Sequence, residues 1–389
     1  MKTKSWTVIY LFALFSFFCS VTLYAQEVEN ISVTERLNKI EDQLKEKSLA
    51  EKWSERIKLS GTIEAEAAYE NISYDDSDAE DEENSDIVLS TVELGVDVDI
   101  TEHVKGNMLF LYEDDEDVVI DEAFILLEGG ESIPLSLKAG KIYIPFGKFE
   151  SNMISDPLTL ELAETRETAV EAGFTLNGFY GSAYIFNGDV DTDNDSENVD
   201  NYGVNFGCTI ENDGFGIDIG LGYINNLIDS NGWESLVEEK STEAQDMGID
   251  FSFVDCVPGL SAHTVLNIGQ IKIIGEYTTM LDEPELNMSE LVSGSLELTE
   301  IGPLIKNEKI SAWNAEIGCT LDVIGKETTF GIGYQGTDNG EDIFPENRFI
   351  GAVSVNIFTD TTASLEYRHD KFANDDETDA LTAQLAIEF

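Results

Sequence analysis

The sequence predicts an all-β fold, a transmembrane antiparallel β-barrel of about 16 strands with a short α-helix in front of it. Three observations support this prediction. Apolar and polar residues alternate with a period of two along nearly the whole chain after residue 56. Many alternating runs have 10–14 residues, whereas a globular strand usually has about five or six and a tilted membrane strand needs about 9–11. The chain also ends on an aromatic residue, Phe389, that completes an alternating segment.

The first 25 residues have the organisation of a secretory signal peptide. A basic start with two lysines precedes an apolar run from Val8 to Val21. This run is too short and too close to the N-terminus for a convincing membrane-spanning helix. We expect residues 1–25 to be removed on export, with cleavage after Ala25.

Residues 26–55 are predicted to form a periplasmic α-helix of coiled-coil-like character. Apolar positions recur at spacings of four, three and four at Val33, Leu37, Ile40 and Leu44, and the segment contains no Gly or Pro. The pattern covers about two heptads. It fits two arrangements equally: a homotrimer held together by this helix, or an amphipathic helix that lies against the chain's own barrel.

Residues 56–389 make up the predicted barrel. Short turns and longer polar segments alternate along it, with one turn expected at Pro258-Gly259, and both of its ends lie on the turn side. Bacterial outer-membrane barrels have this arrangement of short periplasmic turns and long external loops. Segment 256–280 could contain a further strand, which leaves 14 or 18 strands open. The predicted strands are 57–70, 86–100, 103–113, 118–128, 134–145, 167–177, 179–187, 200–211, 214–227, 245–254, 262–280, 308–322, 328–337, 347–358, 362–372 and 379–389.

The charge of the chain excludes one large class of partners. It has 78 Asp and Glu residues against 22 Lys and Arg residues, for a formal net charge of −56. Binding of DNA or RNA is excluded, because a polyphosphate would be repelled over almost the whole surface. Three widely spaced cysteines follow the signal peptide, at positions 208, 256 and 319. They make neither a disulfide framework nor a CxxC metal site.

The long polar segment 146–166 is the first candidate functional site. It follows the tripeptide Pro145-Phe146-Gly147, and a loop of about 20 residues in a compact fold is usually functional or disordered. We expect it to fold inward and narrow a pore, although it could instead lie over the external rim. The charged residues that would then line the constriction are Lys148, Glu150, Glu161, Glu164, Arg166 and Glu167.

Positions predicted to face the barrel lumen are rich in carboxylates. Any lumen-facing residue is expected to be polar, because lipid excludes charge from the opposite face, but the excess of acid predicts a preference for cations. A minority of bases could pair with the acids or form a separate basic track. The acids are Glu64, Glu66, Glu93, Asp97, Asp99, Asp121 and Glu366, and the bases are Lys138, Lys141, Arg166, Arg348 and Arg368.

A second candidate site is a calcium loop. Its carboxylates nearly match the one, three, five, seven, nine, twelve spacing of such loops. Asn194 stands where the turn glycine would be, the last ligand is Asp rather than Glu, and no helices are expected to flank the loop. The candidate ligands are Asp189, Asp191, Asp193, Asp195, Glu197 and Asp200.

The sequence does not support an enzyme. His369-Asp370 is the only candidate pair among the histidines, and adjacent residues point to opposite faces of a strand. The sequence contains no GxSxG, HExxH, Walker A or GxGxxG motif.

The stretch from Trp53 to Thr165 carries a series of motifs that resembles a known family. They are Arg56-Ile57-Lys58-Leu59-Ser60-Gly61-Thr62-Ile63-Glu64, Thr91-Val92-Glu93-Leu94, Leu111-Tyr112-Glu113, Asp121-Glu122-Ala123, Ala139-Gly140-Lys141, Pro145-Phe146-Gly147, Phe149-Glu150-Ser151-Asn152, Asp156-Pro157-Leu158-Thr159 and Glu164-Thr165. This pattern resembles the LbtU family of siderophore porins, named for the legiobactin receptor of Legionella. The order of signal, helix, barrel and terminal Phe fits the same family.

The resemblance implies a barrel in the outer membrane of a Gram-negative bacterium that imports ferric siderophore without a TonB plug domain. It transfers no binding site. Two alternatives remain open from the residues: a general or cation-preferring porin, and a structural barrel that tethers the outer membrane through its periplasmic helix. A ferric siderophore that is an anion would be slowed by so negative a field, so either a basic track or a neutral or cationic cargo is required.

Overall fold

The computed structural model describes residues 54, 56–75, 79–114, 117–130, 133–188, 190, 192, 199–235, 237, 249–290, 308–340 and 344–389. The predicted signal peptide and nearly all of the predicted helix over 26–55 lie outside these residues. Among the described residues, no helix has the length and apolar character needed to cross a bilayer.

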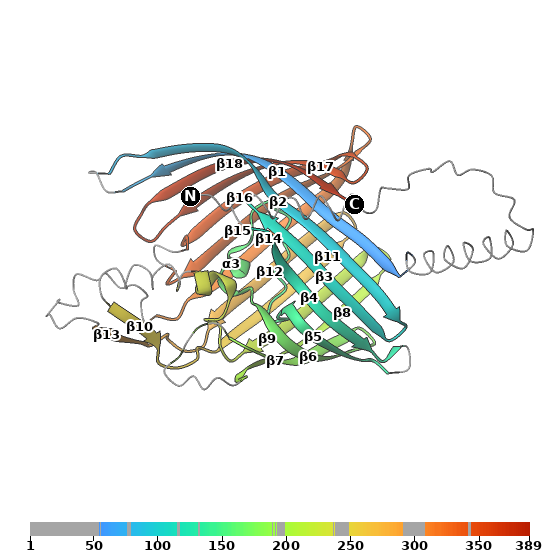
Figure 1. Cartoon of the computed structure of the whole chain (residues 1–389). Coiled ribbons are helices and arrows are strands. Elements are labelled where there is room, and N and C mark those ends of the chain that lie inside the picture. The colour runs from blue at the N-terminus through green and yellow to red at the C-terminus, as the bar shows by residue number, and fades with distance from the viewer. Residues whose placement is uncertain are drawn as a thin grey trace, which may run out of the picture. The chain divides into compact units, whose positions relative to one another are not determined.

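Sixteen of the described strands form one closed antiparallel barrel (Figure 1), as predicted. Neighbours in sequence pair with each other, and β1 (Ile57–Ser73) closes the barrel against β18 (Glu377–Glu388). The remaining barrel strands are β2 (Glu82–Thr101), β3 (Val104–Glu113), β4 (Val119–Glu128), β5 (Leu135–Tyr143), β6 (Arg166–Leu176), β7 (Phe179–Phe186), β8 (Asn201–Asn212), β9 (Phe215–Ile224), β11 (Gly259–Ile268), β12 (Ile271–Met280), β14 (Ser311–Val323), β15 (Lys326–Asp338), β16 (Asn347–Phe358) and β17 (Thr361–Lys371).

Two of the predicted strands are wrong, and the two errors compensate in the strand count. The run 262–280 is not one strand but parts of β11 and β12, which turn tightly between Ile268 and Ile271. Gly269 supplies the positive φ of 59° that this turn uses. The only local sign of the break is a one-residue shift in the phase of the alternation: Ile268 and Ile271 share a face across the turn, whereas they would lie on opposite faces of one continuous strand.

The predicted strand 245–254 does not belong to the barrel. Its residues include β10 (Ile249–Phe253), which pairs with β13 (Leu286–Glu290) in a separate two-stranded sheet. Pro258-Gly259, predicted as a turn, consequently lies at the loop end, where β11 begins after the long link from β9. The backbone N–H and C=O groups of a short alternating segment can form hydrogen bonds in the barrel or in a separate sheet. Which sheet the segment joins therefore depends on the partner strand that is available.

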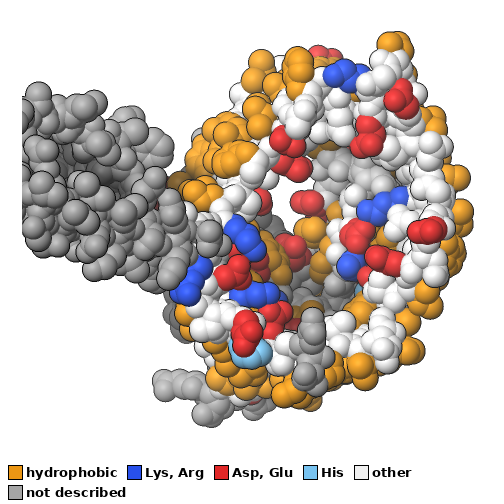
Figure 2. Space-filling model, turned by 90° about the vertical axis from the view of Figure 1, so that its right-hand side faces the viewer, with side chains coloured by type: hydrophobic (Ala, Val, Ile, Leu, Met, Phe, Trp, Pro, Cys, Tyr) orange, Lys and Arg blue, Asp and Glu red, His pale blue; other side chains and the backbone are white. Residues whose placement is uncertain are grey.

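The alternation along each strand separates a lipid face from a lumen face. On β18, Leu381, Leu385 and Ile387 are exposed, whereas Ala380 and Ala386, which point to the other face, are buried. Figure 2 looks into the barrel from the side of the short turns; hydrophobic side chains surround the outside, and acidic and basic side chains line the mouth. An apolar outer face on a closed barrel belongs in lipid, and the protein is an outer-membrane barrel.

The backbone pairing of the barrel continues to the last residue. Phe389 donates its N–H to the carbonyl of Gly61 at 3.0 Å, and Gly61 donates to the carbonyl of Phe389 at 2.9 Å. The terminal aromatic residue therefore completes the closure of the barrel and is itself exposed on the outside.

The hydrophobic core lies inside the loop end of the barrel. It is formed where the segment between β5 and β6 packs on strand residues and on the link after β9. The segment contains the short helix α3 (Leu158–Ala163), which contacts β12, β14 and β15. Fully buried members are Ile142, Phe146, Leu158, Leu162, Ile224, Leu227, Ile228 and Trp233.

Candidate functional site

The segment 144–165, between β5 and β6, crosses the lumen and binds to the opposite wall. Its backbone begins beside β9, where the carbonyl oxygen of Phe146 lies 1.9 Å from the point that a Cβ on Gly222 would occupy. Farther along, it is hydrogen-bonded to side chains of β12, β14, β15, β16 and β17. We call residues 144–165 the lumen loop.

Three buried glutamates hold the N-terminal half of the lumen loop. Glu276 on β12 accepts hydrogen bonds from the N–H groups of Lys148 (2.7 Å) and Phe149 (2.8 Å). Glu316 on β14 accepts from the N–H of Asn152 (2.7 Å) and from the Ser151 hydroxyl (2.9 Å). These carboxylates are 5% and 3% exposed, so the loop donors replace the water they would otherwise bind.

The third glutamate, Glu366 on β17, has the same relation to the next residues of the loop. It accepts from the N–H of Ile154 at 2.5 Å, and from the N–H and the hydroxyl of Ser155 at 3.2 and 2.5 Å. It is 2% exposed. The three glutamates therefore bind the loop at residues 148–149, 151–152 and 154–155, at intervals of three residues.

The C-terminal half of the lumen loop is held by a buried ion-pair network. Arg348 on β16 donates from Nε to Asp370 at 2.7 Å and from Nη1 to Glu161 of α3 at 2.8 Å. Its Nη1 also contacts the carbonyl oxygen of Asp156 at 3.3 Å. The N–H of Leu158 donates to Oε1 of Gln335 at 3.1 Å. These contacts fix α3 against the wall.

The link after β9 packs on the lumen loop from the other side. The Ser230 hydroxyl donates to the carbonyl of Leu162 at 2.8 Å, and the N–H of Asn231 donates to the carbonyl of Glu164 at 2.8 Å. Trp233 is fully buried among the same apolar residues. The lumen loop is therefore packed on the wall on one face and on this link on another.

One residue of the lumen loop has a backbone conformation that tertiary contacts must impose. Phe149 has φ of 55°, in the left-handed region that bulky residues rarely adopt. This conformation directs the successive N–H groups of Lys148 and Phe149 to one carboxylate, as in the anion-binding nests formed by consecutive main-chain amides. Such a conformation costs on the order of 1–3 kcal/mol and persists only when the surroundings determine it.

Two of the predicted constriction residues, Lys148 and Glu150, belong to a series of ion pairs in the lumen. Lys148 Nζ lies 3.4 Å from Asp218 on β9 and 3.5 Å from Glu150, and Lys272 on β12 lies 2.7 Å from Glu150. Burial alone would raise the pKa of Glu150, but the two lysines lower it below its ordinary value. These side chains are about one third exposed.

The other predicted constriction residues lie at two further places. Glu161 binds Arg348, as described above. Glu164 and Arg166 lie at the end of the loop, where Arg166 is paired with Asp121 of β4 and Glu164 accepts from the Asn231 side chain at 3.3 Å. Burial, together with Asp156 and Asp121, raises the pKa of Glu164 to about 7. The predicted residues therefore do not meet in one ring.

The lumen wall on β1 and β2 carries carboxylates of a different kind. The amide of Gln384 donates to Glu64 at 3.4 Å and to Glu66 at 3.0 Å. Within the described part of the chain, neither these two residues nor Glu93 on β2 forms an ion pair with Lys or Arg. These three carboxylates differ in this respect from Asp99 and Glu70 on the same strands, which pair with Lys58 and Arg368.

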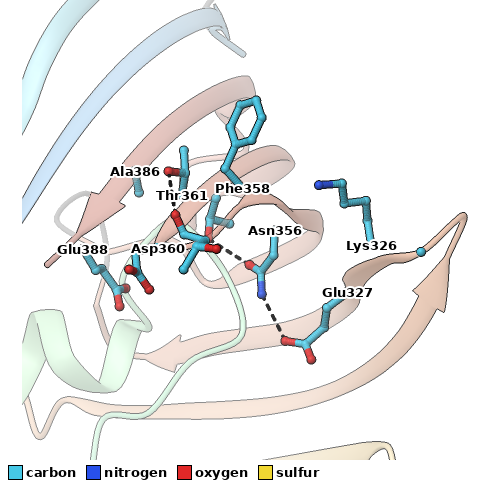
Figure 3. Close-up of a pocket in the computed structure, with 11 residues that line it drawn as sticks. Lys326, Glu327, Asn356, Phe358, Asp360, Thr361, Ala386 and Glu388 are labelled. Carbon is cyan, nitrogen blue, oxygen red and sulfur yellow. Dashed lines mark hydrogen bonds between the residues drawn. The ribbon is translucent and has the colours of Figure 1, made fainter.

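The turn-side mouth is also acidic. A cavity of about 430 Å³ at the ends of β15–β18 is lined by three carboxylates, Glu327, Asp360 and Glu388, and by Lys326 (Figure 3). Asn356 donates to Glu327 at 3.1 Å and accepts from the Thr362 hydroxyl at 3.0 Å.

The candidate calcium loop falls mostly outside the described residues. Of its six predicted ligands, the structure describes only Asp200. Among the described residues, no group of three or more His, Cys, Asp or Glu side chains is placed to hold a metal. Calcium binding by segment 189–200 stays a prediction.

Sequence reasoning did not find the residues that hold the lumen loop. Glu276, Glu316 and Gln335 were not singled out, and Glu366 and Arg348 were expected only as lumen lining. The alternation places all five on the lumen face. Their shared role depends on a loop at least 110 residues away in sequence, so no local pattern indicates it.

The closed barrel, the polar lumen and the crossing loop define a porin-like outer-membrane barrel. Known structures with this fold include the outer-membrane channel DcaP of Acinetobacter baumannii, which is 11% identical, with a TM-score of 0.56 over 86% of this chain and 97% of that one. Pseudomonas putida OprB is 8% identical, with a TM-score of 0.57 over 86% and 95%. The anion-selective porin of Comamonas acidovorans is 10% identical, with a TM-score of 0.54 over 86% and 99%. At these identities the likeness is one of fold.

Relatives in sequence come from two Gram-negative genera. A UPF0422 protein of Coxiella burnetii is 26% identical over 327 residues, which cover 81% of this chain and 64% of the relative. The UPF0422 protein lpl2888 of Legionella pneumophila is 25% identical over 331 residues, which cover 81% and 59%. The aligned part thus spans less than two thirds of each relative. No family model matches the chain.

Proposed function

We propose that the protein is an outer-membrane channel whose bore is narrowed by the lumen loop. The observation that carries this proposal is the crossing of the lumen by residues 144–165, with hydrogen bonds to glutamates on three strands of the opposite wall. A barrel of 16 strands without such a loop leaves a wide aqueous channel. The loop restricts this channel on one side and leaves the wall of β1 and β2 uncovered.

The cargo we propose is a ferric siderophore. Support comes from the motifs between Trp53 and Thr165 that resemble the LbtU siderophore porins. The acidic lumen favours a chelate that is neutral or positively charged, because like charge in a pore opposes entry.

Uptake of radioactive iron as ferric siderophore tests this cargo. Iron-starved cells that lack the gene are compared with wild-type cells and with cells that carry the gene on a plasmid. We expect uptake to be lost in the deletion strain, restored by the plasmid, and saturable in substrate. Equal uptake in all three strains would contradict the proposed cargo and leave the channel itself to be tested by conductance.

A second candidate function is a general, cation-preferring porin. The observation that favours it is the row of carboxylates at Glu64, Glu66 and Glu93, which no described lysine or arginine neutralises. Reversal potentials in a KCl gradient separate the candidates. A strong preference for K⁺, together with uptake of simple solutes that does not saturate, would favour the general porin.

We also propose a homotrimer that is held together through residues 26–55, on the support of their apolar spacing. Crosslinking in intact cells, with and without this segment, tests the assembly. Trimers that persist without residues 26–55 would place the contacts elsewhere.

A further inference from the structure

The hydrogen bonds between the lumen loop and the barrel wall repeat in a regular pattern. Three strands, β12, β14 and β17, each supply one glutamate, and each glutamate binds a neighbouring pair of loop residues. Five of the bound donors are main-chain N–H groups. The binding of the loop to the wall is therefore largely independent of the identities of the loop side chains.

None of Glu276, Glu316 and Glu366 forms an ion pair with Lys or Arg in the part of the chain that the structure describes. Each is at least 95% buried. If the loop moved away, the carboxylates would have to exchange its donors for lumen water, and among the described residues only Glu316 would keep a donor on the wall, from Asn314 at 3.0 Å. Several hydrogen bonds to charged groups would be broken at once, which opposes release of the loop.

The wall beneath the loop is shaped to receive its backbone. The carbonyl oxygen of Asn152 would lie 3.3 Å from a Cβ on Gly331, and the Asn152 Cβ would lie 3.4 Å from it. At Gly222, the closest loop atom would be at 1.9 Å. The absence of side chains at these positions lets the loop backbone lie directly on the strands, which keeps the glutamates within hydrogen-bond distance.

From these contacts we propose that Glu276, Glu316 and Glu366 are the positioning residues of the channel: they hold the lumen loop as a fixed partition and so set the largest solute that passes. The proposal rests on the channel function proposed above. It assigns size selection to wall residues that need not touch the solute, and it makes the loop an immobile part of the pore rather than a gate.

The first experiment measures the entry of neutral sugars of increasing size into liposomes that contain the protein. The test variant carries Glu276→Gln, Glu316→Gln and Glu366→Gln. The matched control carries Glu64→Gln, Glu66→Gln and Glu93→Gln, which removes the same number of lumen carboxylates without touching the loop. Uncharged sugars do not respond to the altered field, so their flux reports the width of the path.

We expect the test variant to admit larger sugars than the wild type, with a several-fold higher rate for those near the size limit. The control should have the wild-type limit. The proposal is overturned if the test variant keeps the wild-type limit, or if the control widens the path equally. Wild-type protein that passes no sugar of any size would instead contradict the channel function itself.

A second experiment keeps all three glutamates and so does not depend on how well the glutamine variants fold. Asn152→Cys and Gly331→Cys are introduced together after Cys208, Cys256 and Cys319 have been replaced by Ser. The Cβ separation of 3.4 Å is close to the 3.5–4.5 Å of disulfides. A fixed partition predicts equal sugar flux in the oxidised and reduced forms. A loss of flux on oxidation would show that the loop must move, and would overturn the proposal.

Discussion

Glutamates on two parts of the same lumen wall have opposite surroundings. On β12, β14 and β17 they are buried and bound to the lumen loop, as Glu316 is by Ser151 and Asn152. On β1 and β2 they face the uncovered part of the lumen, where Glu64 and Glu66 accept hydrogen bonds from the amide of Gln384. In both regions the residue is a glutamate at a lumen-facing position of a barrel strand.

The difference teaches that a lumen-facing carboxylate has no intrinsic role in a barrel. Where main-chain N–H groups reach it, its charge is used to fix a loop. Where none reach it, its charge remains available to a passing solute and contributes to the field in the pore. The route of residues 144–165 decides between the two, so changes to the loop and to each wall should have separable effects.

Deletion of residues 150–164 should have the largest effect, because it would uncover the wall of β12, β14 and β17 as well as that of β1 and β2. We expect single-channel conductance to rise by a factor of about two or more, since the crossing loop is what narrows the lumen. The control retains the loop but carries Lys148→Ala and Glu150→Ala. It should change conductance much less, and unchanged conductance in the deletion variant would contradict the assignment of the constriction.

Replacement of Glu64, Glu66 and Glu93 by Gln should reduce the preference for cations. Their carboxylates face the uncovered lumen and no described lysine or arginine pairs with them, so their loss should shift the reversal potential in a KCl gradient toward zero. Glu102→Gln, an exposed change at a short turn, serves as the control and should leave the potential nearly unchanged. A potential that is insensitive to the triple change would place selectivity elsewhere.

Gly222→Ala should destabilise the region in which the lumen loop meets β9. The added methyl group would lie 1.9 Å from the carbonyl oxygen of Phe146, and such overpacking typically costs about 1–3 kcal/mol. Gly216→Ala on the same strand is the matched control, since its nearest neighbours would be at 3.6 Å. Urea unfolding of both variants measures the difference, and equal midpoints would refute the close approach.

The smallest expected effect is a pH dependence at the end of the lumen loop. Burial and two neighbouring carboxylates raise the pKa of Glu164 to about 7, above its ordinary value of 4.5. A carboxyl group with a higher pKa in the folded protein favours folding at low pH, and this contribution is lost as pH rises through about 7. We expect the urea midpoint to fall between pH 5 and pH 8, and to fall less in Glu164→Gln. An identical fall in both proteins would exclude Glu164 as the source.

Much of the barrel could be predicted because each strand carries its own two-residue period. Segments such as 347–358, which coincides with β16, are recognisable without their neighbours. The errors at 245–254 and 262–280 arose where the local pattern was compatible with more than one pairing. In 262–280 the break shows only as a one-residue shift in phase between Ile268 and Ile271, and the pairing of β11 with β9 and of β12 with β14 makes the two strands plain.

The candidate site shows the same limit more strongly. The length and composition of segment 146–166 indicated a functional loop, and Lys148 and Glu150 do lie together in the lumen. The glutamates that hold the loop come from β12, β14 and β17, up to 212 residues away from the loop residues they bind. A contact of this kind leaves no local pattern.

By itself, the sequence determined the closed antiparallel barrel, its lipid and lumen faces, and the acidic character of its pore. These properties follow from alternation and composition, which act within each strand. Only the tertiary structure decided which carboxylates hold the lumen loop and which remain open to a solute. That choice depends on the path of one loop through space, because a buried charge is stabilised by whichever donors come within hydrogen-bond distance.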